Sequence, residues 1–359
     1  MKNINSRLAQ LAAVGAMLVL FGAGCTTTTK KTTAAPDMGV WKTSDRGQTW
    51  VLKKALVDGP KVTAGMAEIG VQVLAADPQD RSAIYVGTQD SGLIYSLNGG
   101  DSWQYAENLD ALDIKGVAVD PKNKCTVYAL SANKIFKTKN CGRDWGVTFF
   151  DPRTDRTFTQ IVPDWFNPTF LYAGNNDGDI YKSADEGVSW QAVKRVNAGV
   201  TSMFVSPQDS RVVYVGTDGD GIWKSLDSGV TWVQIRKEFG DIGNARLVIK
   251  LVPDPTDANR IYNVYKGGIA KTEDQGNTWT ALNLVTDIGE NSITDLSIDP
   301  NNPKRLVYTG PTALVFSADG GATWEAKKLP TTNKGNVLLT DVKDGNVVYL
   351  GIIPTKKKK

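Results

Sequence analysis

The octapeptide Thr43-Ser44-Asp45-Arg46-Gly47-Gln48-Thr49-Trp50 sets the pattern of the chain, because closely similar octapeptides return six more times. The shared pattern is Ser/Thr-x-Asp/Asn-x-Gly-x-Ser/Thr-Trp, and Asp144 is its one exception, at the seventh place of the third copy. The other copies span residues 96–103, 138–145, 183–190, 225–232, 272–279 and 317–324. Their tryptophans follow one another at intervals of 53, 42, 45, 42, 47 and 45 residues, so the chain is built from a repeating unit.

Each residue type in the octapeptide suits a tight turn between two strands. The Asp or Asn side chain accepts backbone N–H groups inside the turn, and Gly adopts a positive φ without strain. The tryptophan buries about 150–250 Å² against neighbouring structure. We therefore expect Trp232→Ala to cost about 3–5 kcal/mol. The positions expected to be structural are Asp45 and Trp50, Asn98 and Trp103, Asn140 and Trp145, Asp185 and Trp190, Asp227 and Trp232, Asp274 and Trp279, Asp319 and Trp324.

The segments between the turns predict an all-β fold, a seven-bladed β-propeller of four-stranded antiparallel blades. In the fifth repeat we expect strands at 200–205, 212–217, 221–225 and 231–237, with little room for a helix. The first repeat supplies only two strands, within 39–54, and the last segment supplies the missing two, within 336–353. Pairing these ends would close the ring and remove its open edges. Residues 39–355 are thus expected to form a single propeller.

The N-terminal 25 residues are typical of a bacterial export signal. Lys2 and Arg7 precede an apolar run that is too short to span a bilayer stably. The run ends at Cys25, in a sequence similar to a lipobox except that Gly22 stands where Leu is usual. An ordinary secretory signal is the alternative. We expect a lipidated Cys25 anchored to the cell envelope, in the outer membrane by resemblance to bacterial lipoproteins, with 26–38 as a flexible tether. A basic tail, 356–359, ends the chain.

Composition excludes several classes of function. The formal net charge is +3, but eight of the 41 basic residues lie in 1–36 and 356–359. The remaining 33 basic and 38 acidic side chains give residues 37–355 a net charge of −5, which argues against nucleic-acid binding. The chain has no histidine, so imidazole metal sites and Ser–His catalysis are excluded.

Two of the three cysteines remain if Cys25 carries lipid. Cys125 is expected just before the second strand of its blade, and Cys141 lies in the turn after the third strand. Both places lie at the same end of a four-stranded meander, and an exported protein can form disulfides. We therefore predict a bond between Cys125 and Cys141 that closes a loop of about 17 residues.

The seven turns resemble the Asp box, or bacterial neuraminidase repeat. The added Asp-Pro turns and Tyr-x-Gly strands, as in Asp77-Pro78 with Tyr85-Val86-Gly87, look like the photosystem II stability/assembly factor group. Sortilin-type receptors and xyloglucanases have the same style of repeat. The resemblance covers residues 39–353 and implies a propeller that binds proteins during assembly of an envelope complex. It also implies that Asp boxes are structural and lie away from the functional face.

Candidate binding residues lie mostly in the loops between the second and third strands. Asp90, Asp177, Asp218 and Asp220 fall there, and Asp179 is a further carboxylate of these loops. Trp165 is an aromatic candidate in a segment that replaces the short turn between the first two strands of its blade. Asp177, Asp218 and Asp220 are weak candidates for a two-carboxylate glycosidase, although tight loops need Asp for structural reasons. A Ca²⁺ ion bound to 218–221 is unsupported by full ligand spacing. No other cofactor or metal is expected. A sialidase would need clustered arginines, and those near inserted loops are Arg153, Arg156, Arg195, Arg236 and Arg246.

These observations favour a lipid-anchored, monomeric, non-catalytic propeller that binds an envelope protein as a scaffold or assembly factor. The alternative is a glycan-acting envelope protein, either a glycoside hydrolase of sialidase or xyloglucanase type, or a lectin. An enzyme should show converging carboxylates with at least one raised pKa, whereas a scaffold should show a broad loop face.

Overall fold

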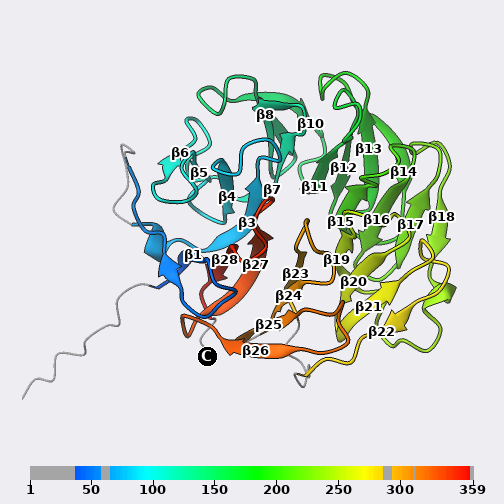
Figure 1. Ribbon diagram of the computed structural model, residues 1–359. Helices are drawn as coiled ribbons and strands as arrows, with labels where there is room; N and C mark the ends of the chain where they lie inside the picture. Colours follow the sequence, from blue (N-terminus) through cyan, green and yellow to red (C-terminus); the bar gives the residue numbers. More distant parts are fainter. Residues whose placement is uncertain (1–36, 58–64, 286–292, 311, 356–359) are drawn as a thin grey trace, which may run out of the picture. The chain divides into compact units, whose positions relative to one another are not determined.

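Short apolar runs between turn-forming residues fold into seven separate four-stranded antiparallel sheets. The computed structural model describes residues 37–57, 65–285, 293–310 and 312–355. The expected export signal, lipidated Cys25, nearly all of the tether and the basic tail lie outside the described residues. Figure 1 shows the seven sheets arranged around a common centre, so the prediction of a seven-bladed all-β propeller is confirmed.

Each blade runs from an innermost to an outermost strand. The innermost strands are β3 (Val71–Ala76), β7 (Ile114–Asp120), β11 (Phe158–Pro163), β15 (Val200–Val205), β19 (Val248–Pro253), β23 (Asp295–Ile298) and β27 (Lys334–Thr340). The second strands are β4 (Ile84–Thr88), β8 (Asn123–Ser131), β12 (Leu171–Asn175), β16 (Val213–Thr217), β20 (Ile261–Tyr265), β24 (Leu306–Thr309) and β28 (Val348–Ile353).

The two outer positions complete the blades. The third strands are β5 (Leu93–Ser96), β9 (Lys134–Thr138), β13 (Asp179–Ser183), β17 (Ile222–Ser225), β21 (Gly268–Thr272), β25 (Ala313–Ser317) and β1 (Gly39–Thr43). The outermost strands are β6 (Gln104–Tyr105), β10 (Gly146–Phe150), β14 (Gln191–Arg195), β18 (Val233–Ile235), β22 (Thr280–Ala281), β26 (Glu325–Lys328) and β2 (Val51–Leu52). Two 3₁₀ turns, η1 (Met66–Glu68) and η2 (Lys237–Phe239), lie in connecting loops.

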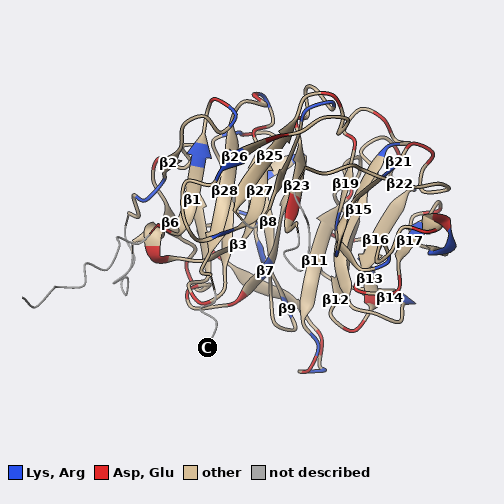
Figure 2. Cartoon of the chain, turned by 90° about the horizontal axis from the view of Figure 1, so that it is seen from below, with Lys and Arg blue, Asp and Glu red and all other residues tan. Residues whose placement is uncertain are grey.

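The ring closes by pairing the two ends of the chain. The closing sheet has the order β2-β1-β28-β27, and β1 pairs with β28 over five positions, from Gly39 opposite Ile352 to Thr43 opposite Val348. Blue β1 lies beside red β28 in Figure 1, and Figure 2 shows the same pairing from a second direction. Closure by joining N-terminal and C-terminal strands is therefore confirmed.

The recurring octapeptide forms the same hydrogen-bond network in all seven turns between third and fourth strands. The first hydroxyl donates to Oδ1 of the Asp or Asn at 2.7–2.9 Å and accepts the glycine N–H at 2.8–3.1 Å. The same Oδ1 accepts the backbone N–H four residues later at 2.8–3.0 Å. The turn's internal polar groups are thus paired locally.

Asp144, which replaces the usual Ser or Thr, fits in its turn because the residue that it contacts is Asn140 and not an aspartate. In five turns the Asp Oδ2 accepts a Ser or Thr hydroxyl at 2.5–2.6 Å. In the third turn Asn140 instead donates its amide to the Asp144 carboxylate at 2.6 Å. The donor and acceptor have traded places, so the turn keeps its cross-link.

Neighbouring blades are joined through the backbone of these turns. A tyrosine on the second strand and a lysine on the third both donate to one carbonyl in the next blade's turn. That carbonyl belongs to a residue with positive φ, which directs it toward the neighbour. The lysine also lies over the tyrosine ring, with nitrogen-to-centroid distances of 5.0–5.5 Å. The four clamps are Tyr128 and Lys137 to Glu186, Tyr172 and Lys182 to Ser228, Tyr214 and Lys224 to Gln275, and Tyr349 and Lys42 to Gly99.

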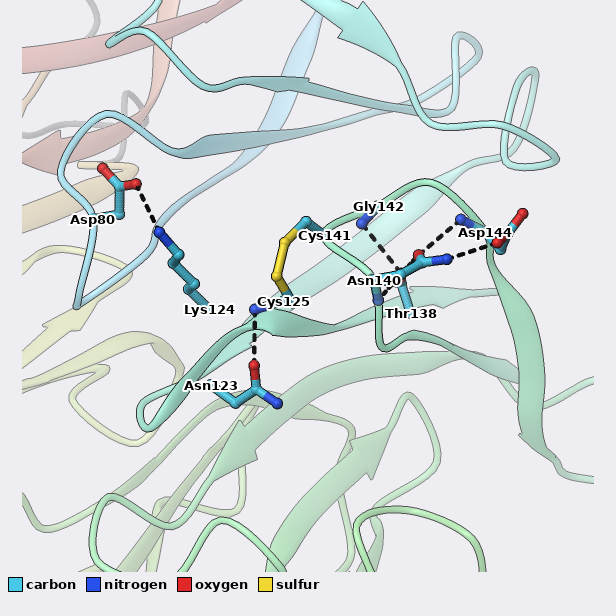
Figure 3. The surroundings of a disulfide bond; sticks show 9 residues. All are labelled: Asp80, Asn123, Lys124, Cys125, Thr138, Asn140, Cys141, Gly142 and Asp144. Carbon is cyan, nitrogen blue, oxygen red and sulfur yellow. Dashed lines mark hydrogen bonds and ion pairs between the residues drawn. A yellow bond between two sulfur atoms is a disulfide. The ribbon is translucent and has the colours of Figure 1, made fainter.

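A disulfide joins Cys125 to Cys141 across one blade, as Figure 3 shows. The sequence places Cys125 just before the second strand. In the structure it lies inside β8, because this strand already begins at Asn123. The backbone N–H of Cys141 donates to the carbonyl of Cys125 at 3.1 Å, so the bond connects two segments that already meet. It fastens the Asn140 turn to the second strand.

Replacing both of these cysteines by serine is expected to lower the free energy of unfolding by about 3 kcal/mol, because the unfolded chain regains the entropy of an open loop. Thermal unfolding without reductant measures the effect, and wild type treated with reductant should match the double variant. Free alkylation of both thiols in the native exported protein would contradict the bond.

The Asp-box carboxylates make the fold sensitive to acid. Hydroxyl hydrogen bonds from the Ser or Thr four residues on lower the pKa of Asp45, Asp185, Asp227, Asp274 and Asp319 to about 2, from an ordinary 3.8. A lowered pKa in the folded state gives stability that is present above the unfolded value and is lost as the pH falls through the folded one.

We therefore expect the melting temperature to fall between pH 4 and pH 2 as the turns protonate. Asp227→Asn should reduce this dependence, because asparagine already serves in the turn of Asn98. Calorimetry at several pH values measures the slope, and an unchanged slope in the variant would argue against these carboxylates as its source.

Candidate functional site

The two ends of the blades differ in what they present. The Asp-box turns and the turns between first and second strands share one end, and the remaining loops share the other, because the strands alternate in direction. Figure 2 shows that charged segments gather at the ends of the strands, whereas the strands themselves are largely uncharged. We call the end that lacks the Asp boxes the loop face. Loops placed by a rigid ring are the usual location of binding sites.

Four of the five binding candidates lie on the loop face, and Trp165 does not. Asp90, Asp177, Asp218 and Asp220 follow second strands, whereas Trp165 lies in the turn between β11 and β12, at the Asp-box end. Its side chain is 45% exposed. The five residues therefore do not form one patch.

An arginine–aspartate cluster occupies the loop face where the blade of β7–β10 meets that of β11–β14. We define it as Asp151, Arg153, Arg156, Asp177, Asp179, Tyr181 and Arg195. Asp151 follows β10, Asp179 begins β13 and Arg195 ends β14, so two blades and one inserted loop build it.

Buried carboxylates in this cluster hold exposed guanidinium groups. Arg153 donates to Asp151 at 2.6 Å and to Asp179 at 2.9 Å. Arg195 donates to Asp179 at 2.6 Å and also pairs with Asp177. The Arg153 and Arg195 side chains are 42% and 54% exposed, whereas those of Asp151 and Asp179 are 3% and 8% exposed. The donor groups are thus fixed in direction and face solvent.

These contacts shift the pKa values of Asp151, Arg153 and Arg195. Hydrogen bonds from Arg153 hold the pKa of Asp151 far below its usual range, and the same bonds raise the pKa of Arg153. The hydrogen bond with Asp177 raises the pKa of Arg195. Asp151, Arg153 and Arg195 are therefore ionised at neutral pH.

Parts of the constellation that a sialidase needs do meet here. Tyr181 donates to the Asp151 carboxylate at 2.7 Å, and Arg153, Arg156 and Arg195 lie around it. Burial, however, raises the pKa of Tyr181. A buried neutral phenol is a poor nucleophile.

The other carboxylate candidates have different surroundings. Asp220 is buried and accepts Trp223 Nε1 at 3.2 Å, Gln234 Nε2 at 2.8 Å and the N–H of Asn197 at 3.2 Å. It therefore holds its own loop in place. Asp218 is exposed, and its backbone joins the loop to Leu247 through an isolated bridge.

The described carboxyl groups offer little for acid–base catalysis on the loop face. Of those whose pKa is displaced, Asp77 alone is displaced upward, because it is buried. Asp77 directly follows β3, in the turn to β4 at the Asp-box end. Its Oδ1 accepts the N–H groups of Gln79 and Asp80. The carboxyl group with the raised pKa is therefore separated from the loop face by the length of β4.

Within 37–57, 65–285, 293–310 and 312–355, no three His, Cys, Asp or Glu side chains are grouped so as to hold a metal ion. Across the part of the chain that the structure describes, no helix is long and apolar enough to cross a membrane.

Sequence reasoning did not find the arginine–aspartate cluster. The sequence places Arg153, Arg156 and Arg195 near inserted loops and Asp179 in the loop after a second strand, but nothing in it pairs them with one another or with Asp151. The available signal was weak: acidic and basic residues alternate in 151–156, and two aspartates follow at 177 and 179.

Comparison with known proteins gives one family and several relatives. A model of the family described as Photosynthesis system II assembly factor YCF48 matches residues 73–338. A xyloglucanase of Hypocrea jecorina (strain QM6a) is 24% identical over 323 residues, which cover 81% of this chain and 36% of that protein. A xyloglucanase of a Paenibacillus species is 28% identical over 158 residues, 43% of this chain and 14% of that protein. The chain therefore spans about a third or less of these relatives.

Solved structures show the same fold. The structure described as YCF48 bound to D1 peptide superposes with a TM-score of 0.62 at 15% identity, covering 81% of this chain and 94% of that one. The GH74 xyloglucanase from Xanthomonas campestris gives a TM-score of 0.65 at 17% identity, covering 79% of this chain and 51% of that one. At these identities the likeness shows the fold alone.

Proposed function

This chain belongs to the Photosynthesis system II assembly factor YCF48 family, and from that membership we propose that its propeller binds an acidic segment of a protein partner. The contact surface is the arginine–aspartate cluster on the loop face. The binding is non-catalytic and serves a scaffold or assembly role. We propose further that lipid on Cys25 holds the protein in the cell envelope, on the strength of residues 1–25.

One observation carries the proposal: half-exposed arginine side chains are held by ion pairs with buried carboxylates. Asp151 and Asp179 orient Arg153 and Arg195, whose side chains stay 42% and 54% exposed. Arginine forks that are already fixed lose little entropy when they bind a carboxylate. A relative described as YCF48 bound to D1 peptide supports a peptide as the kind of ligand.

The test is capture of partners from intact cell envelope by cross-linking and pull-down with the full-length chain. Arg195→Gln is expected to reduce capture about tenfold and to weaken its dependence on salt. Arg211→Gln is the matched control, because Arg211 is an exposed arginine paired with Asp209 at the Asp-box end. Equal capture by both variants would refute the loop face as the contact.

Glycan hydrolysis is the second candidate, favoured by the similarity to xyloglucanases. The carboxylates to test are Asp177, Asp218 and Asp220. A screen for cleavage of xyloglucan and sialylated glycans should detect no turnover if the protein is a scaffold. Cleavage that is lost in Asp218→Asn or Asp220→Asn would replace our proposal with this one.

A further inference from the structure

The outermost strand β10 differs from the other outer strands in a way that suits strand addition. Four of the others are only two or three residues long, and β14 and β26 carry two and three charged residues. Short or charged edges discourage pairing with another chain. β10 has five residues, Gly146-Val147-Thr148-Phe149-Phe150, and none is charged. Among the described outer strands it is the one edge of five residues that carries no charged side chain.

A β-bulge at Thr148 places two apolar side chains on one exposed face of this strand. Val147 pairs opposite Phe136 and Phe150 opposite Lys134, so both lie on the same face of the sheet. Phe149 pairs opposite Ile135 and so lies on the other face, where it packs against the next blade. Val147 and Phe150 are 50% and 59% exposed.

Cations flank the C-terminal end of β10 on both faces. Arg153 binds Asp151, the residue directly after the strand, and its guanidinium lies on the side of the next blade, bonded to Tyr181. Lys134, opposite Phe150, is exposed on the other side. Acidic side chains on a segment beside this end of β10 would therefore meet opposite charges.

We propose that β10 accepts an extended peptide segment as a fifth strand of its blade. This inference rests on the proposed function and names where and how the partner binds. The segment alternates apolar with polar residues and carries acidic residues at the end that lies beside Arg153. Backbone hydrogen bonds to the free edge give affinity, and contacts with Val147 and Phe150 select the apolar residues.

The probe is a synthetic peptide of about ten residues in which valine alternates with threonine. Two aspartates stand at the terminus that would lie beside Arg153. Fluorescence anisotropy with the full-length chain measures Kd, and hydrogen exchange reports protection of the amides of 146–150. Val147→Lys and Phe150→Lys are each expected to raise Kd about tenfold. Val233→Lys is the matched control, an exposed valine on outer strand β18 that should leave Kd unchanged. Circular dichroism confirms that the variants fold.

The outcomes separate this inference from the proposed function. A peptide with asparagines in place of aspartates should bind more weakly, and one with prolines at alternate positions should not bind. Absence of binding up to about 1 mM, unchanged Kd in Val147→Lys and Phe150→Lys, or protection at another strand would overturn the inference. So would dimers that form through β10 without peptide. If Phe150→Lys still captures the envelope partner while Arg195→Gln does not, the proposed function stands and strand addition at β10 falls.

Discussion

Removal of residues 336–359 is expected to leave the protein unable to fold into a soluble monomer. The deletion takes β28 and most of β27, which are two of the four strands of the closing blade. β1 then loses its partner over five positions, and the hairpin of β1 and β2 remains as a marginal two-stranded piece. Apolar side chains that contact those strands, including Val40 and Val71, are exposed.

Expression and sedimentation of the truncated chain measure the effect. Deletion of 356–359 alone is the control, because it leaves β28 intact and should yield as much soluble monomer as wild type. A soluble, monomeric protein that lacks 336–359 would show that the ring does not depend on its joined ends.

Trp103→Ala is expected to lower the free energy of unfolding by about 3–5 kcal/mol, more than any other single Asp-box tryptophan. Trp103 is fully buried, and its indole donates to the carbonyl of Lys53 at 2.9 Å. Its backbone also pairs with Ala55 and Val57. The residue therefore joins its own blade to the segment that leaves the closing blade, and its loss creates a cavity at that contact.

Trp232→Ala provides the comparison for Trp103. Trp232 is only partly buried, and its indole donates to Gly229 within its own turn at 3.0 Å. We expect its cost to fall toward the low end of the same range of about 3–5 kcal/mol. Denaturant unfolding of the two variants measures the difference, and a larger loss in Trp232→Ala would contradict this ranking.

The regular part of the fold could be predicted because each repeat carries its own turn signals. The expected strands at 200–205, 212–217 and 221–225 agree with β15, β16 and β17 within one residue. The outermost strand was expected at 231–237 but spans Val233–Ile235. An outer strand is paired on one side only, so its ends leave the sheet where local propensity alone would extend them.

The candidate site could be predicted only in part, because ion pairs obey no spacing rule. Asp177 was found as a loop carboxylate, but its pairing with Arg156 and Arg195 depends on how two loops meet. Trp165 was included among the binding residues although its turn, between β11 and β12, lies at the Asp-box end. Because strand direction alternates within each blade, the sequence alone places the turn between the first two strands at the same end as the Asp boxes.

The join between β1 and β28 has a consequence for how such a chain can gain or lose repeats. The unit that recurs in the sequence is offset by half from the unit that folds, since each end of the chain supplies two strands of the closing blade. Duplication or loss of one sequence repeat therefore adds or removes an entire blade and leaves the pairing of β1 with β28 unchanged. Rings with different numbers of blades can arise in this way, and each is closed by the same pairing of its two ends.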